Sequence, residues 1–124
     1  MKKILRISVL YIIVFCTNVF ASEDFFKDAK NLFDQGKFEQ SKFLFQRNIV
    51  FNPKDSNSYL YLAKIYKDKK DQINEEKNLN ATLLINPANE EAILMLMEIG
   101  LEKTNYSKVK DLSEKFTKVC IELC

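Results

Sequence analysis

Apolar residues recur at helical spacing along most of the chain, and two Asn-Pro steps interrupt them at a fixed interval. The steps are Asn52-Pro53 and Asn86-Pro87, and each closes a stretch of similar pattern. Phe25 opens the first stretch, and Tyr59 opens the second at the same distance before its proline. The resulting period of about 34 predicts a chain of helix–turn–helix repeats, because each unit needs its neighbours to cover its apolar face.

The apolar spacing predicts six helices between residue 22 and the C-terminus. Ser22 is expected to cap the first helix and Asn89 the fifth, while Gly36 ends the first. The helices are expected at Glu23–Gln35, Phe38–Phe51, Ser56–Lys69, a stretch that ends before Pro87, a stretch after Asn89, and a last stretch after Asn105. The last helix is expected to reach the chain end with one apolar stripe of Val109, Leu112, Phe116, Val119, Cys120 and Leu123.

The pairing of these helices resembles the tetratricopeptide repeat family. The first unit matches the family pattern at Phe25, Ala29, Leu32, Gly36, Lys37, Phe38, Ser41, Phe45, Ile49, Asn52 and Pro53. The second matches at Tyr59, Leu62, Ala63, Tyr66, Leu79, Leu83, Asn86 and Pro87, and the third at Ile93, Leu96, Asn105, Tyr106, Val109 and Phe116. The resemblance implies an all-α solenoid of three repeats, six antiparallel helices in all, at residues 22–55, 56–89 and 90–123.

The chain departs from the family pattern at four positions. Lys70 stands where the family prefers Gly, and Glu75 stands where a small residue is usual. Met97 occupies the small-residue position of the third unit, and Gly100 replaces a bulky residue there. We therefore expect looser or shifted packing between the second helix of repeat two and the first helix of repeat three. An ordinary helical bundle is the alternative.

The N-terminal segment 1–21 is interpreted as an export signal. Lys2, Lys3 and Arg6 precede an apolar run that is too short for a comfortable membrane span, and Ala21 ends a plausible cleavage site. An uncleaved N-terminal anchor is the alternative. Cys16 loosely resembles the lipidated residue of a bacterial lipoprotein, although a small apolar residue within the signal is the favoured interpretation. These features predict a protein of the bacterial periplasm or cell envelope.

Charge and composition argue against nucleic-acid binding and catalysis. Three of the 19 basic side chains lie in the signal, so the 17 acidic groups slightly outnumber the basic ones in the remaining domain. A nucleic-acid-binding domain would need a basic stripe. The chain has no histidine, and it shows no nucleophile–base pair, phosphate-binding loop or paired carboxylates. We expect no enzyme, cofactor or metal site.

Cys120 and Cys124 stand one helical turn apart near the chain end. Helical cysteines at this spacing rarely direct their Cβ atoms toward each other, so we interpret them as two thiols. A bridge at a frayed helix end is the alternative.

The resemblance implies that the first helix of each repeat lines a peptide-binding groove. The implied groove residues are Phe26, Lys30, Phe33, Asn57, Leu60, Tyr61, Lys64, Lys67, Glu91, Leu94, Met95, Glu98 and Glu102. We expect them to fall off the buried faces of their helices. The aromatic and apolar members favour an interaction site over scattered surface residues. Lysines at one end and glutamates at the other would steer an acidic part of the ligand toward repeats one and two.

The expected function is therefore a non-enzymatic adaptor or scaffold that binds a protein or peptide in the bacterial envelope. The alternative is a self-associating or membrane-tethered assembly factor. Its dimer contact would be the final helix, where Leu123 would stay partly open. A membrane tether would come from the N-terminus.

Overall fold

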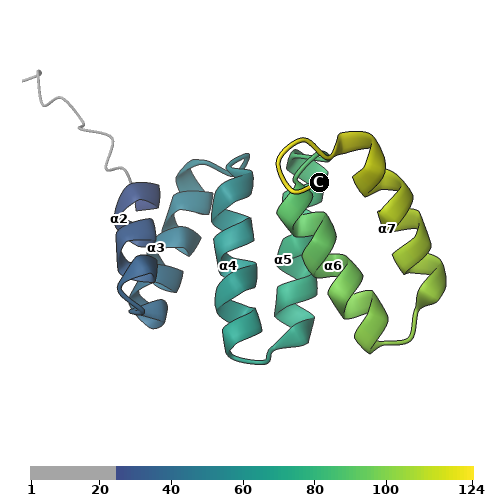
Figure 1. Cartoon of the computed structure of the whole chain (residues 1–124). Helices are drawn as coiled ribbons and strands as arrows, with labels where there is room; N and C mark the ends of the chain where they lie inside the picture. Colours follow the sequence, from purple (N-terminus) through teal and green to yellow (C-terminus); the bar gives the residue numbers. More distant parts are fainter. Residues whose placement is uncertain (1–24) are drawn as a thin grey trace, which may run out of the picture.

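The computed structural model of the protein describes residues 25–124, and this part of the chain is all-helical. The predicted signal segment 1–21, Cys16 and the Ser22 cap lie outside the described residues, as does the predicted start of the first helix at Glu23. Figure 1 shows the helices side by side in chain order. They are α2 (Phe25–Asp34), α3 (Phe38–Phe51), α4 (Ser56–Asp68), α5 (Gln72–Ile85), α6 (Glu90–Glu102) and α7 (Tyr106–Val119).

The helix boundaries recur at the same period as the Asn-Pro steps. The helices α3, α5 and α7 begin at Phe38, Gln72 and Tyr106, while α4 and α6 begin at Ser56 and Glu90. Each helix packs against the next one along the chain, from α2 on α3 to α6 on α7. The described chain is therefore a row of three helical hairpins (Figure 1).

Short polar side chains fix the helix starts. Asp55 accepts a hydrogen bond from the backbone N–H of Asn57 at the start of α4. Asn89 does the same for α6, with its Oδ1 atom 2.9 Å from the Ala92 nitrogen. Such caps satisfy backbone donors that have no partner within the helix. The predicted Asn89 cap is confirmed.

The turn inside each hairpin uses one residue with a positive φ angle. These residues are Gly36 at 73°, Lys70 at 57° and Thr104 at 52°, at equivalent positions of the three hairpins. Glycine adopts this backbone region without a steric penalty, whereas a side chain makes it unfavourable. Lys70 therefore keeps the turn geometry despite its departure from the family pattern.

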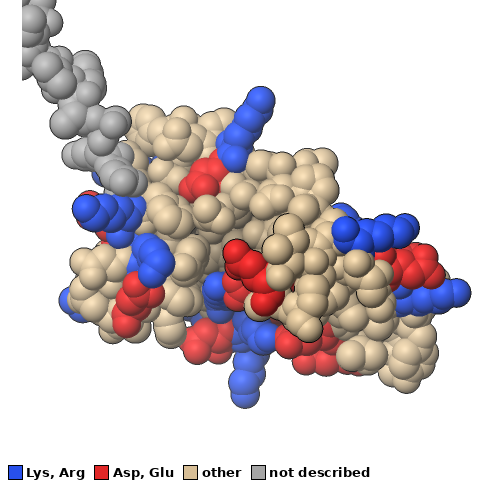
Figure 2. All heavy atoms as spheres, turned by 45° about the horizontal axis from the view of Figure 1, so that its top comes forward, with Lys and Arg blue, Asp and Glu red and all other residues tan. Residues whose placement is uncertain are grey.

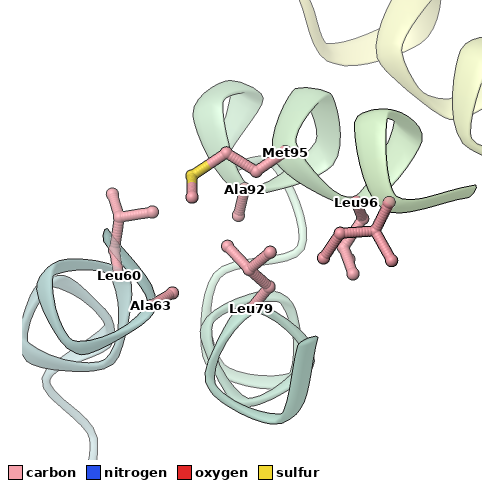
Figure 3. Close-up of a cluster of buried hydrophobic side chains, with 7 residues drawn as sticks. Leu60, Ala63, Leu79, Ala92, Met95 and Leu96 are labelled. Atoms are coloured by element: carbon pink, nitrogen blue, oxygen red, sulfur yellow. The ribbon is translucent and has the colours of Figure 1, made fainter. Parts of the chain in front are cut away.

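Small residues allow the helices of the first two hairpins to approach closely. Ala29 and Ala63 are completely buried, and the Ser41 hydroxyl on α3 donates to the Ala29 carbonyl on α2 at 2.8 Å. One apolar cluster joins α2, α3 and α4 around the buried Phe45. A second joins α4, α5 and α6 around Leu79, and Figure 3 shows Leu79 facing the side chains of the two neighbouring helices.

The C-terminal helix ends earlier than predicted. Helix α7 stops at Val119, and Cys120 takes an extended backbone conformation, so the expected helical stripe through Leu123 is wrong beyond that point. The chain then turns back, which brings the Cα atoms of Cys120 and Cys124 to 5.7 Å in a disulfide. The interpretation of two thiols is wrong. The bridge forms because these residues have left the helix, where their Cβ atoms would point apart.

Candidate functional site

The first helix of each hairpin lines a hollow of about 1060 Å³ that opens on one side of the molecule. We call this space the hollow. Its lining includes all of the predicted groove residues except Phe33 and Glu102, namely Phe26, Lys30, Asn57, Leu60, Tyr61, Lys64, Lys67, Glu91, Leu94, Met95 and Glu98. It also includes residues that sequence reasoning missed, at the start of α6 and in the C-terminal segment, namely Ala88, Asn89, Glu90, Ile121, Glu122 and Leu123.

Aromatic rings form the wall of the hollow on the side of α2 and α4. The Tyr61 ring stacks on the core residue Phe45 with ring centroids 5.1 Å apart. Phe26 and Phe33 meet Tyr61 edge-on, at 5.9 and 5.0 Å between centroids. All three groove aromatics are half-buried. Phe33 thus supports Tyr61 without lining the hollow itself.

Leu60 and Met95 belong to the core, contrary to the expectation that they fall off the buried faces of their helices. Leu60 is 6% exposed and Met95 is 7% exposed. Both join the cluster around Leu79, and Figure 3 shows them approaching each other from α4 and α6. They are buried because α4 and α6 each pack against more than one neighbouring helix. The half-buried apolar side chains that remain at the hollow include Phe26, Tyr61 and Leu94.

Ion pairs cross the hollow between α4 and α6. Lys64 lies 2.8 Å from Glu91, and Lys67 pairs with Glu98 further along the two helices. The hydrogen bond to Glu98 raises the pKa of Lys67. The lysines belong to α2 and α4 and the glutamates to α6, but the helix register places Lys64 and Lys67 each beside a glutamate of the next hairpin.

The two remaining predicted charges, Lys30 and Glu102, also have hydrogen-bond partners. Lys30 lies 2.7 Å from Asp34 on its own helix, and this hydrogen bond raises the pKa of Lys30. Glu102 accepts a hydrogen bond from the Gln72 amide at 2.5 Å. Basic and acidic side chains also lie beside one another over much of the face shown in Figure 2. An acidic part of a ligand is therefore attracted less strongly to Lys30, Lys64 and Lys67 than it would be if these lysines had no acidic neighbours.

The C-terminal segment lines part of the hollow and is attached to Glu90. The backbone N–H of Ile121 donates to Glu90 Oε1 at 2.6 Å, and that of Leu123 donates to Oε2 at 2.8 Å. Glu122 donates to the same carboxylate at 3.1 Å. These backbone bonds, that of Ile121 above all, lower the pKa of Glu90. The cysteine spacing was the one signal in the sequence that pointed to a turn here.

Residues 25–124 contain no group of three or more His, Cys, Asp or Glu side chains placed to hold a metal ion. None of the helices in this same range is long and apolar enough to cross a membrane. Comparison of the sequence with models of known families and with curated proteins gives no match. The hollow therefore has to be interpreted from its own geometry, which offers an apolar aromatic wall beside a row of cross-helix ion pairs.

Proposed function

We propose that this chain is a non-enzymatic adaptor that binds a peptide segment of a protein partner in the hollow. The observation behind this proposal is the position of the hollow, which is lined by the first helices of three successive hairpins. The resemblance to the tetratricopeptide repeat supports it, since helix boundaries and positive-φ turns recur at the period of the Asn-Pro steps. In this proposal the hairpins form a short solenoid of that family.

The side chains of the hollow suit an extended or helical peptide. Phe26, Tyr61 and Leu94 offer partly exposed apolar surface, which an apolar ligand side chain would cover. Lys64 and Glu91 keep 25% and 46% of their side-chain surface exposed, so they remain able to exchange their mutual pair for polar groups of a ligand. The ligand would therefore combine apolar anchors with charges of both signs.

Selection of binders from a displayed library of random dodecapeptides against the full chain tests the proposal. We expect selected peptides to bind the wild type and to lose affinity for Leu94→Asp by at least about tenfold, which corresponds to roughly 1.4 kcal/mol. Ile73→Asp is the matched control, because Ile73 is 81% exposed on α5 and does not line the hollow. Thermal unfolding of both variants verifies that they fold.

A charge exchange gives a second, stricter test. The double variant Lys64→Glu/Glu91→Lys retains the ion pair while it reverses the direction of the local dipole. Peptides whose charges contact this pair should lose affinity, and they should regain it when their own charges are reversed. Equal loss of affinity in the Ile73→Asp control, or selected peptides that are indifferent to every substitution in the hollow, would contradict binding at this site.

Export to the bacterial envelope is part of the proposal and rests on the N-terminal sequence pattern. Fractionation of cells that express the full chain, followed by determination of the mature N-terminus by mass spectrometry, tests it. Cleavage after Ala21 supports a free exported protein. A lipid-modified peptide beginning at Cys16 supports a tethered one, and full-length protein in the cytosol contradicts export.

Self-association is a second candidate, because α7, the last helix of the row, contains no fully buried side chain. Near the turn between α6 and α7, Leu101 in the last turn of α6 is 52% exposed and Tyr106, the first residue of α7, is 68% exposed. A dimer through this end would cover them. Light scattering at rising protein concentration tests this candidate, with Leu101→Asp expected to abolish the dimer. A monomer throughout would contradict it.

A further inference from the structure

The segment Cys120–Cys124 forms a small covalent ring at the end of the chain, which we call the C-terminal ring. Figure 1 shows this segment curving back from α7 toward α6. Its closure fixes residues that would otherwise be a free chain terminus, where disorder is usual. The ring therefore needs no extensive packing of its own to hold a defined shape.

One side chain holds the C-terminal ring in place. The Glu90 carboxylate accepts the backbone N–H groups of Ile121, Glu122 and Leu123, all within 3.2 Å. Three donors can converge on one carboxylate only when the backbone curves around it, and closure of the ring imposes that curvature. Charge-assisted bonds of this kind are stronger than neutral ones. Glu90 also lies in the first turn of α6, where a negative charge is favourable.

The C-terminal ring presents apolar side chains at the hollow instead of burying them. Ile121 is 87% exposed and Leu123 is 52% exposed, and both line the hollow. The hollow is also lined by the apolar groups of Phe26, Tyr61 and Leu94. Ile121 and Leu123 therefore do not fill the hollow in the manner of an internal ligand. They add apolar surface to its rim that an incoming segment could cover.

We infer that the C-terminal ring is a redox-dependent wall of the hollow, which contacts an apolar side chain of the bound peptide while the Cys120–Cys124 disulfide is intact. Reduction opens the ring, frees the backbone from Glu90 and removes this wall. Binding of the peptide is then weaker in the reduced protein. This part of the inference rests on the proposed function, whereas the dependence of the ring on its disulfide does not.

The redox step is an ordinary thiol–disulfide exchange with a dithiol as reductant. A thiolate of the dithiol attacks one sulfur of the Cys120–Cys124 bond, which breaks as a mixed disulfide forms and the other cysteine leaves as a thiolate. The second thiol of the reductant then displaces the protein sulfur. The products are two protein thiols and the oxidised dithiol, after transfer of two electrons and two protons. Cys124 is exposed, which gives the reductant access.

Amide hydrogen exchange of the full chain measures the ring directly. We expect the amides of Ile121, Glu122 and Leu123 to exchange on the order of tenfold faster after reduction with dithiothreitol. The double variant Cys120→Ser/Cys124→Ser should show the fast rate under both conditions. Glu90→Gln should accelerate the same amides in the oxidised protein, because it weakens the acceptor without changing its shape. Glu91→Gln is the matched control, since Glu91 pairs with Lys64 and not with the ring.

Mass spectrometry of the tryptic peptide that follows Lys118 shows whether the bridge is present, independently of Cys16. A bridged peptide with slow exchange that becomes fast on reduction supports the inference. Free thiols in protein isolated under oxidising conditions would overturn it, as would equal exchange rates in the two redox states.

The ligand arm uses the dodecapeptides selected for the hollow. We expect reduction to weaken their binding by about three- to tenfold, and Ile121→Ser to weaken it similarly without opening the ring. Equal affinity in both redox states would overturn the role of the ring as a contact wall. If no peptide binds the oxidised or the reduced protein, the proposed function has failed, and hydrogen exchange still decides whether the ring depends on the disulfide.

Discussion

Gly100 on α6 lies directly against Val109 on α7, so closely that a Cβ atom on Gly100 would be 2.8 Å from Val109 Cγ2. Gly100 is buried in this contact. The equivalent positions of the second hairpin hold Tyr66 and Glu75. The third hairpin thus has no side chain on its first helix where the second has a large one, and a valine fills the contact from the facing helix. Gly100 replaces a bulky residue of the repeat pattern, and its lack of a side chain allows α6 and α7 to lie in close contact.

Gly100→Ala is expected to destabilise the protein by about 1–2 kcal/mol. Alanine favours a helix over glycine by about 1 kcal/mol, but the added methyl group would overpack the contact with Val109, a residue whose branched side chain has little freedom in a helix. Urea unfolding of the two proteins measures the difference. In a Val109→Ala background the same substitution should stabilise, because the methyl group then has room. A loss of stability of equal size in both backgrounds would contradict this account.

The turn residues give a second prediction. Thr104→Gly should stabilise the protein by about 1 kcal/mol and Lys70→Gly by about 0.5 kcal/mol, because both positions have positive φ angles and threonine is branched at Cβ. Thermal unfolding measures both changes. Gly36→Ala is the converse control. A Cβ atom there meets nothing within 4 Å, so its expected cost of about 1 kcal/mol is conformational only.

Asn48 connects the first two hairpins, and its loss gives a third prediction. Its side chain is 3% exposed and donates to Asp55 Oδ2 at 2.7 Å and to the Ser58 hydroxyl at 2.8 Å. Asp55 caps α4, so Asn48→Ala should disturb both the cap and the buried Ser58. We expect a loss of about 2 kcal/mol in chemical unfolding. Asn52→Ala should cost less than half as much, because Asn52 is exposed and donates one bond of 3.1 Å.

The sequence pattern was sufficient to predict most of the helical architecture. The boundaries Phe38–Phe51 are confirmed, and α4 ends one residue before the predicted Lys69. These boundaries follow from local signals such as caps, Asn-Pro steps and apolar spacing. The end of α7 cannot be predicted from such local signals, because a disulfide and the Glu90 carboxylate, which is remote in sequence, hold the final residues outside the helix.

Most side chains that line the hollow were predictable from the sequence, whereas their contacts and burial were not. The resemblance to the repeat family implied that Lys64 and Met95 line a groove, and both line the hollow. The resemblance does not specify that Lys64 meets Glu91 or that Met95 is buried against Leu60, since both depend on how neighbouring hairpins stack. Contacts between repeats therefore required the structure, and the peptide-binding role itself stays a prediction.

Glu75 gives the last prediction, because it is 6% exposed in the first turn of α5. Burial raises its pKa, the nearby Glu102 and Glu98 raise it further, and Lys67 acts in the opposite direction. Folding therefore favours the protonated form. The stabilisation from this group is complete below the pKa of the unfolded chain and is lost as the pH rises through the higher pKa of the folded state.

Glu75→Gln removes the charge and retains the shape, so it should stabilise the protein at pH 7 on the order of 1 kcal/mol and have little effect in acid, where Glu75 is protonated. Urea unfolding of both proteins across this pH range measures the difference. The adjacent Glu76 is the matched control. Its pKa is lowered by hydrogen bonds from Lys103 and Lys108, both at 2.6 Å, so Glu76→Gln should instead destabilise at pH 7 by about 0.5–1 kcal/mol. A shift of the same sign in both variants would show that burial does not govern the ionisation of Glu75.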